Sequence, residues 1–396
     1  MDRRRFIAFA GGVALASMLP RTAAADAPGW RAVFARLSPA LRAVLDDPDR
    51  QVQLIWLRPQ RLRGGGVRMQ SLAHGLERRR WFSPASVSKL PMALLMAERL
   101  SEHGLGADAA VRLHAPPMSG EWPDDEPLGE SFARGVNRTF AVSDNAPYNR
   151  WYEALGADAI HARLAALGHR DVRLLSRLGS ADAEANRRSV GAALLDAHGA
   201  TVASTPAMHA APRRFPFGEA RIGSGWMNDA GEVLPGPRDV SRSNFMPLAD
   251  SLAMLQAFVL PESVPARRRW RIDDPLRERL LAALGLRPRD SIDPPYDEAA
   301  YPDGHARWFF VGDGRQRYPD GLRVLGKTGM AWGWLSEVAH VRDADSGAEF
   351  MLAASIHCNA DGIYNDDRYD YDDVGLPFLA EIARAVLAVE RDARTG

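Results

Sequence analysis

The sequence predicts an α/β protein of the α+β kind, in which one sheet is assembled from both ends of the chain. Three observations predict it: a helix and two strands near the start, a long helical middle, and strands with a closing helix at the end. The 396 residues are 46% hydrophobic, which is enough for a sizeable core. No internal repeat or low-complexity tract interrupts this order.

The first half of the chain alternates between helical and extended patterns. Ser83-Pro84-Ala85-Ser86 opens one of its helices, and Pro91 lies in the first turn, where a missing amide is tolerated. The other elements expected here are a helix over 29–46, a strand over 52–57, a glycine-rich turn over 61–67 into a second strand, and a helix over 146–167.

In the second half of the chain the periodic hydrophobic pattern first becomes weaker, and strand patterns then reappear. Residues 198–305 are rich in proline and glycine, and we expect them to form an inserted region that covers the cleft rather than a separate domain. The elements expected in and after it are helices over 247–260 and 274–286, strands over 308–311, 322–325, 337–341 and 349–357, and a final helix over 377–391.

The first residues of the chain have the pattern of an export signal. Twin arginines within Arg3-Arg4-Arg5, an apolar run over 7–19 and a small-residue site at Ala23-Ala24-Ala25 predict a twin-arginine signal peptide over 1–25. A membrane anchor is the alternative, but the run is shorter than the roughly 20 residues of a spanning helix. The mature domain would be 26–396, in the periplasm or secreted.

Charge and cysteine usage exclude several classes of function. Fifty acidic residues balance fifty basic ones, so we expect no nucleic-acid partner and, after signal cleavage, no membrane partner. The single cysteine, Cys358, excludes an intramolecular disulfide and is expected to be a buried apolar side chain. The ten histidines show no paired spacing, so we predict no catalytic metal and no cofactor, in a protein expected to be monomeric.

Lysine is nearly absent from the chain. Of the 50 lysine and arginine residues only Lys89 and Lys327 are lysines. Arginine can replace lysine wherever a solvated positive charge suffices, but not where an amine must lose its proton. The two lysines therefore indicate where chemistry is done.

Both lysines lie in short motifs, and a third motif lies between them. The order is Ser86-Val87-Ser88-Lys89, then Ser143-Asp144-Asn145, then Lys327-Thr328-Gly329. A Ser-x-x-Lys alone occurs roughly once by chance in a chain of this length. All three in this order form a specific pattern, and the chain here resembles the serine β-lactamase and penicillin-binding-protein superfamily.

This resemblance implies a fold and a set of roles. The fold is an antiparallel sheet flanked by terminal helices plus an all-helical lobe, β-lactamase/transpeptidase-like. Ser86 would be the nucleophile, with Lys89 as its base and Ser143 as the proton carrier to the leaving group. Asn145 would bind the substrate amide, and Asp144 would hold its loop.

The strand that carries the second lysine would bind the rest of the substrate. Lys327 and Thr328 would hold a substrate carboxylate, Gly329 would permit close approach, and the amides of Ser86 and Met330 would form the oxyanion hole. The implied partner is a small-molecule or peptidoglycan-type substrate.

The chain departs from class A β-lactamases in the base for deacylation. Their Glu-x-x-x-Asn segment corresponds to residues 177–188, where Glu184 and Asn186 are only two positions apart. Glu184 is the candidate base and Asp182 the second choice, and a solvated loop carboxylate is the alternative interpretation. The longer spacing between the second and third motifs indicates a long, divergent branch.

Three further interpretations compete with a β-lactamase. Gly321 to Thr328 also matches the phosphate-binding Walker pattern, but Leu322, Val324 and Leu325 are strand formers and not a flexible loop. A D-Ala-D-Ala peptidase or penicillin-binding protein would be acylated in the same way but would release β-lactams slowly. A non-catalytic cell-wall binding protein is the alternative from another class.

Overall fold

The computed structural model describes residues 28–228, 230–314 and 317–395. The predicted signal peptide over 1–25 lies outside the described residues. The α-helices are α1 (Pro28–Phe34), α2 (Pro39–Asp46), α3 (Lys89–Glu102), α4 (Phe132–Ala141), α5 (Ala146–Leu155), α6 (Ala157–Ala166), α7 (Leu248–Val259), α8 (Asp274–Leu284) and α9 (Leu376–Thr395).

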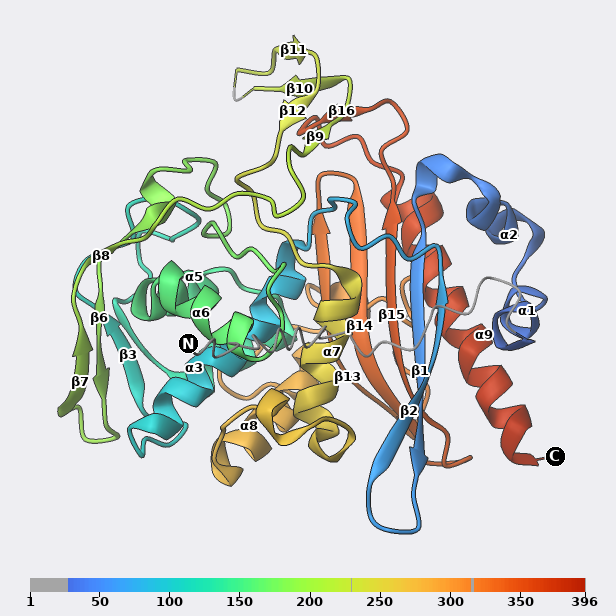
Figure 1. The fold of residues 1–396 in the computed structure, drawn as a ribbon, viewed down its shortest axis with the longest axis horizontal. Helices are drawn as coiled ribbons and strands as arrows, with labels where there is room; N and C mark the ends of the chain where they lie inside the picture. The colour runs from blue at the N-terminus through green and yellow to red at the C-terminus, as the bar shows by residue number, and fades with distance from the viewer. Residues whose placement is uncertain (1–27, 229, 315–316, 396) are drawn as a thin grey trace, which may run out of the picture.

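Strands from both chain ends form the central sheet. The long strands are β1 (Gln53–Arg61), β2 (Val67–His74), β13 (Leu322–Ala331), β14 (Trp334–Asp343) and β15 (Glu349–His357). They pair in the order β13-β14-β15-β1-β2, and every pairing is antiparallel. The register sets Gln53 opposite Ser355, so the N-terminal strands close against the C-terminal ones (Figure 1).

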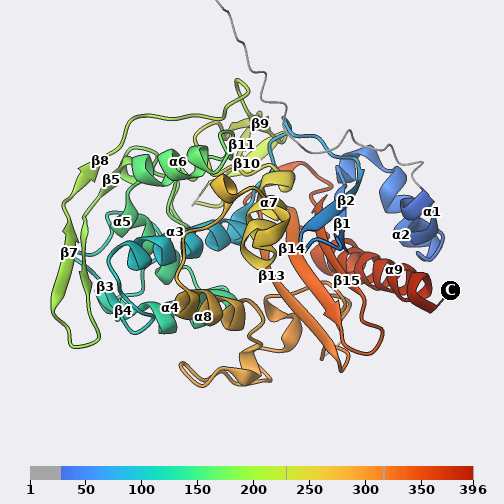
Figure 2. The same ribbon diagram turned by 60° about the horizontal axis from the view of Figure 1, so that its bottom comes forward.

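Alternation along the strands gives the sheet two buried faces. On β1, Leu54 and Trp56 belong to a core with α9 and α1, whereas Ile55 and Leu57 point into a second core with α3 and α7. A strand buried on both faces is mostly apolar, as β15 is from Phe350 to Ala354. Figure 2 shows α9 on one side of the sheet and α3 and α7 on the other.

The second part of the molecule is a helical lobe that also contains a small sheet. Helices α3 to α6 pack together, and a four-stranded antiparallel sheet covers their outer side, in the order β4-β3-β6-β7. Its strands are β4 (Gly129–Ser131), β3 (Ala110–Leu113), β6 (Ala192–Leu195) and β7 (Thr201–Thr205). The expected antiparallel sheet with terminal helices is confirmed, but the lobe is not entirely helical.

The region over 198–305 contributes both surface and core. Helix α7 packs on β14 and β15, and α8 packs on α4 and β13. The rest of the region includes short strands, most of which lie at the top of Figure 1. These are β8 (Met208–His209), β9 (Arg221–Ile222), β10 (Gly225–Met227), β11 (Val233–Pro235) and β12 (Arg238–Asp239), with β5 (Arg188–Ser189) and β16 (Ile363–Tyr364) from outside the region.

Three predicted elements differ in the structure. The helix over 29–46 is two helices, because Pro39 starts α2 with Ser38 as its N-cap. The helix over 146–167 breaks at Gly156, whose φ is 74°. The predicted strand over 308–311 is a buried turn, and its amides at Trp308 and Phe309 donate to the carboxylate of Glu337 at 2.9 and 2.7 Å.

Candidate active site

Ser86 lies on a short 3₁₀ turn, η2 (Ala85–Ser88), that leads directly into α3. Ala85 adopts a left-handed φ of 41°, a conformation that L residues rarely take and that needs support from the surroundings. The turn brings the side chains of Ser86 and Lys89 together, with Nζ 3.0 Å from Oγ. Ser86 is half-buried and can be reached from the surface.

The amine of Lys89 is enclosed by hydroxyl and carbonyl groups. It donates to the carbonyl oxygen of Ser143 and lies 3.1 Å from the Ser143 Oγ. The side chain is fully buried. A primary amine between two serine hydroxyls can accept a proton from one and pass it to the other, which is the arrangement that nucleophilic catalysis requires.

Burial lowers the pKa of Lys89 to about 7, because the charged ammonium loses its hydration, and the negative charges of Asp144 and Glu121 only partly oppose this. With this pKa, a substantial fraction of the amine is the free base near neutral pH. Lys89 therefore has both the position and the proton affinity of a general base for Ser86.

We expect the rate of Ser86 acylation to rise with pH and to level off above an apparent pKa near 7, because only the neutral amine of Lys89 accepts the serine proton. The measurement is the rate of covalent labelling by a reactive penicillin from about pH 5 to about pH 9. A rate that stays constant through this range would contradict the role of Lys89 as base.

Ser143 and Asp144 lie in a strained loop that a buried ion network holds. Ser143 has a left-handed φ of 64°, which is uncommon for a side chain that is not glycine. Asp144 accepts from the Arg138 guanidinium at 2.9 and 2.7 Å and from the Ala146 amide at 2.9 Å. The network fixes the loop, and the loop places the Ser143 hydroxyl between the two lysines.

Lys327 supports the same hydroxyl from the other side. Its Nζ lies 2.8 Å from the Ser143 Oγ, and the side chain is fully buried. Burial lowers the pKa of Lys327 well below its ordinary value, and the neighbouring charges of Lys89 and Arg307 lower it further. The Ser143 hydroxyl therefore lies within hydrogen-bond distance of two amines, those of Lys89 and Lys327.

Thr328 and Gly329 face the protein rather than open space. Thr328 is 2% exposed, and its hydroxyl donates to the carbonyl of Ala306 at 3.1 Å, so in this arrangement the hydroxyl is not presented to a substrate carboxylate. A Cβ on Gly329 would lie 2.3 Å from the Pro84 carbonyl oxygen. The glycine is needed here because β13 closely approaches η2, the turn that carries Ser86.

The expected oxyanion hole stays a prediction. β13 is an edge strand of the central sheet, so alternate amides on its outer side have no strand partner. Met330 lies on this strand, and its side chain is 42% exposed. β13 lies next to η2, the turn that carries Ser86, as an oxyanion hole with one amide from each segment requires.

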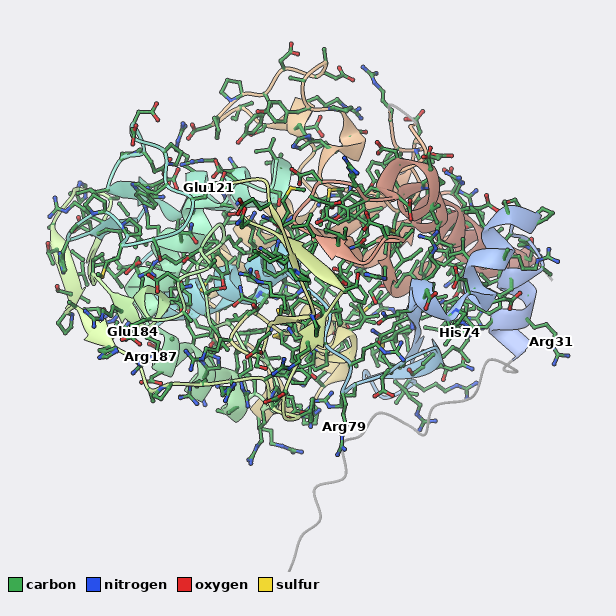
Figure 3. The ribbon with its side chains drawn as sticks, turned by 90° about the horizontal axis from the view of Figure 1, so that it is seen from above. Arg31, His74, Arg79, Glu121, Glu184 and Arg187 are labelled. Carbon is green, nitrogen blue, oxygen red and sulfur yellow. The ribbon has the colours of Figure 1, made fainter. Side chains whose placement is uncertain are left out.

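Glu184 is not brought to this cluster. Its carboxylate is 52% exposed, accepts from Arg187 at 2.6 Å and lies 3.1 Å from His209 Nε2. Figure 3 shows Glu184 beside Arg187, well away from Glu121. The assignment of Glu184 as deacylating base therefore lacks geometric support, since the 3₁₀ turn at Ala185–Arg187 directs this segment to the outer surface of the lobe.

Sequence reasoning missed Glu121, which does reach the cluster. Its carboxylate accepts a hydrogen bond from the Asn145 side chain. Asn149 fixes its backbone, because Nδ2 donates to the Glu121 carbonyl at 2.9 Å and to the Leu178 carbonyl at 3.1 Å. Glu121 belongs to no motif and lies in a proline-rich loop, so only the contacts of Asn145 and Asn149 reveal it.

The other predictions about the site region can also be placed. Residues 322–331, which include most of the Walker-like segment, form one continuous strand, so there is no phosphate-binding loop. Cys358 is buried, and burial raises the pKa of its thiol to about 12, as expected of an inert side chain. Within the described ranges no cluster of acidic, histidine or cysteine side chains could hold a metal ion.

None of the helices between residues 28 and 395, as far as the structure describes them, is long and apolar enough to cross a bilayer.

Comparisons with known proteins agree with the fold. A family model described as "Beta-lactamase enzyme family" matches residues 66–210, which include Ser86, Lys89 and Asn145. A β-lactamase from Sphaerobacter thermophilus is similar at 16% identity and a TM-score of 0.51, covering 91% of this chain and 97% of that chain. No curated protein matches the sequence significantly.

Two further solved structures are similar at lower TM-scores. A β-lactamase from Xanthomonas campestris pv. campestris has a TM-score of 0.49 at 16% identity, covering 90% of this chain and 98% of that chain. PBP-A has a TM-score of 0.46 at 15% identity, with 89% and 97% covered. The family model over residues 66–210 and the fold shared with the Sphaerobacter thermophilus protein agree with the resemblance to serine β-lactamases and penicillin-binding proteins that the three motifs indicate.

Proposed function

We propose that the protein is an exported serine hydrolase that forms an acyl-enzyme on Ser86 with β-lactams or related amides. One observation carries this proposal: the buried amine of Lys89 lies 3.0 Å from the Ser86 hydroxyl and 3.1 Å from that of Ser143. The export step rests on the twin arginines and the small-residue site within 1–25.

The steps of acylation follow from these contacts. The neutral amine of Lys89 takes the proton of Ser86 as Oγ attacks the substrate carbonyl carbon. The amine then returns a proton, and Ser143 carries it to the leaving nitrogen as the carbon–nitrogen bond breaks. Lys327 holds the Ser143 hydroxyl at 2.8 Å, so the proton path is oriented before substrate arrives.

A penicillin-binding protein with slow release is the second candidate, and the position of Glu184 favours it. Hydrolysis of the acyl-enzyme needs a base that activates water, and the loop over 177–188 directs its glutamate to the outer surface. A non-catalytic binding protein is less well supported, because it would have no need for a buried amine with a pKa of about 7.

We expect a penicillin to label Ser86 in a burst of about one equivalent, followed by a steady rate well below that of an efficient β-lactamase. The mass of the intact protein measures the adduct, and peptide mapping locates it. Ser86→Ala should take up no label, whereas Ser88→Ala, two positions along the same turn, should still be labelled.

The possible outcomes separate the candidates. Rapid turnover without a burst would favour an efficient β-lactamase over a penicillin-binding protein. A folded protein that no acylating probe labels at Ser86 would remove the proposal and leave the binding-protein alternative.

A further inference from the structure

Within the described part of the chain, the Glu121 carboxylate forms no ion pair, although it is hydrogen-bonded to Asn145 of the second motif. The negative charges of Glu121 and Asp144 raise the pKa of Lys89 against the effect of burial, so both carboxylates act electrostatically on the amine. Asp144 is occupied by the Arg138 guanidinium. Glu121 is exposed, and its side chain is held by the neutral amide of Asn145.

The backbone around Glu121 is fixed from two directions. Its amide donates to the Leu178 carbonyl at 2.9 Å, and the Asn149 side chain bridges Glu121 and Leu178. Gly120 has a φ of 97°, and a Cβ there would lie 2.8 Å from the Cβ of Arg177. The carboxylate is therefore presented from an ordered loop and not from a free chain end.

The neighbouring loop has a glycine, Gly179, where it passes closest to Glu121. Gly179 has a φ of 78°, and a Cβ there would lie 2.9 Å from both the backbone nitrogen and the Cβ of Glu121. A carboxylate cannot be placed at this position without moving the Glu121 loop. The acidic side chain beside Asn145 is therefore that of Glu121, and not one from the loop that contains Gly179.

We propose that Glu121 is the general base that activates water for hydrolysis of the acyl-enzyme, an inference that rests on the proposed function. The carboxylate takes a proton from a water molecule, and the water oxygen attacks the acyl carbon. The bond from that carbon to Ser86 Oγ then breaks, and the product leaves as an acid. Glu121 gives up the proton that it took from water, and an equivalent proton reaches Oγ through Lys89 and Ser143, so both the base and the nucleophile are restored.

The position on Asn145 suits this role. The side-chain amide has two hydrogens, so it can donate one to Glu121 and the other to the carbonyl of the acyl group. This would hold the base next to the bound acyl chain on its solvent side, where water is available. An exposed base without a second partner orients water poorly, which accounts for the slow release expected above.

The test separates acylation from release. Wild type, Glu121→Gln and the matched control Glu184→Gln are labelled with penicillin, freed of excess probe, and followed by intact mass as the adduct disappears. We expect Glu121→Gln to be labelled at least as fast as wild type, because removing the charge favours neutral Lys89, and to release about 10²-fold more slowly. Glu184→Gln should match wild type in both steps.

A nucleophile that needs no base gives a second readout. Hydroxylamine should release the adduct from Glu121→Gln and from wild type at similar rates if Glu121 acts only on water. Glu121→Asp, which keeps a carboxylate on a shorter side chain, should restore part of the hydrolysis, and thermal melting shows that each variant is folded.

Several results would overturn the inference while leaving Ser86 acylation intact. Equal release from Glu121→Gln and wild type would show that Glu121 is not the base. Faster labelling with unchanged release would mean that Glu121 only competes with substrate for Asn145. If Glu121→Gln released the adduct slowly both by hydrolysis and with hydroxylamine, Glu121 would position the acyl group and would not act as the base. Absence of labelling in wild type would instead remove the proposed function, and this inference with it.

Discussion

Lys89→Arg is expected to slow acylation of Ser86 by about 10³-fold, because a guanidinium does not lose its proton at any pH at which the protein is folded. The native amine is buried, and burial brings its pKa to about 7, so the free base is available where an arginine would remain charged. The longer side chain must also fit a space that holds one amine between Ser86 and Ser143.

The measurement is the rate of penicillin labelling, compared with that of Arg99→Lys. Arg99 lies on the same helix, is 38% exposed and pairs with Glu102, so exchange of the two cations there should change neither labelling nor stability. Labelling of Lys89→Arg at the wild-type rate would show that Ser86 is activated by another group.

Arg150→Met is expected to lower the free energy of unfolding by about 3–5 kcal/mol, because it leaves two buried carboxylates with one cation fewer. The Arg150 guanidinium is fully buried and donates to Glu126 at 2.6 Å and to Glu130 at 2.7 Å. Arg138 shares both glutamates and also holds Asp144, so the loss should loosen the loop that carries Ser143.

Urea unfolding of Arg150→Met and Arg134→Met checks this expectation. Arg134 contacts the same Glu130 from the same side of the lobe, but it is 43% exposed and its other partner, Asp293, is at the surface. Its replacement should cost about 1 kcal/mol or less. If the two variants lost equal stability, the buried network would contribute no more than a surface ion pair.

Elements with strong periodicity could be predicted from the sequence, and elements fixed by tertiary contacts could not. The strands β1, β14 and β15 and the helices α7 and α9 lie where alternation or helical spacing placed them, because both patterns report burial directly. The turn over 308–311 has the composition of a strand but is fixed by Glu337, a residue from another part of the chain. A sequence window cannot contain that partner.

The same distinction applies to the site. Ser86, Lys89, Ser143 and Lys327 were found from their motifs, and their side chains meet in the structure. Glu184 was chosen by its distance along the chain from Ser143, and that distance does not determine the path of the loop. Glu121 is close to Asn145 only because Asn149 and Leu178 hold two remote loops together, a relation that no local pattern encodes.

The pairing of β1 with β15 has a consequence for biogenesis. Gln53 pairs with Ser355, although most of the sequence separates the two residues. The face of β1 that carries Leu54 and Trp56 is covered by α9, which ends at Thr395. Contacts so distant in sequence form late during folding. A nascent or carboxy-terminally truncated chain would contain Ser86 and Lys89 yet lack the strand that brings Lys327 to them. Only fully synthesised and folded chains should therefore react with a penicillin, and a ribosome-bound chain should not be labelled by the same probe.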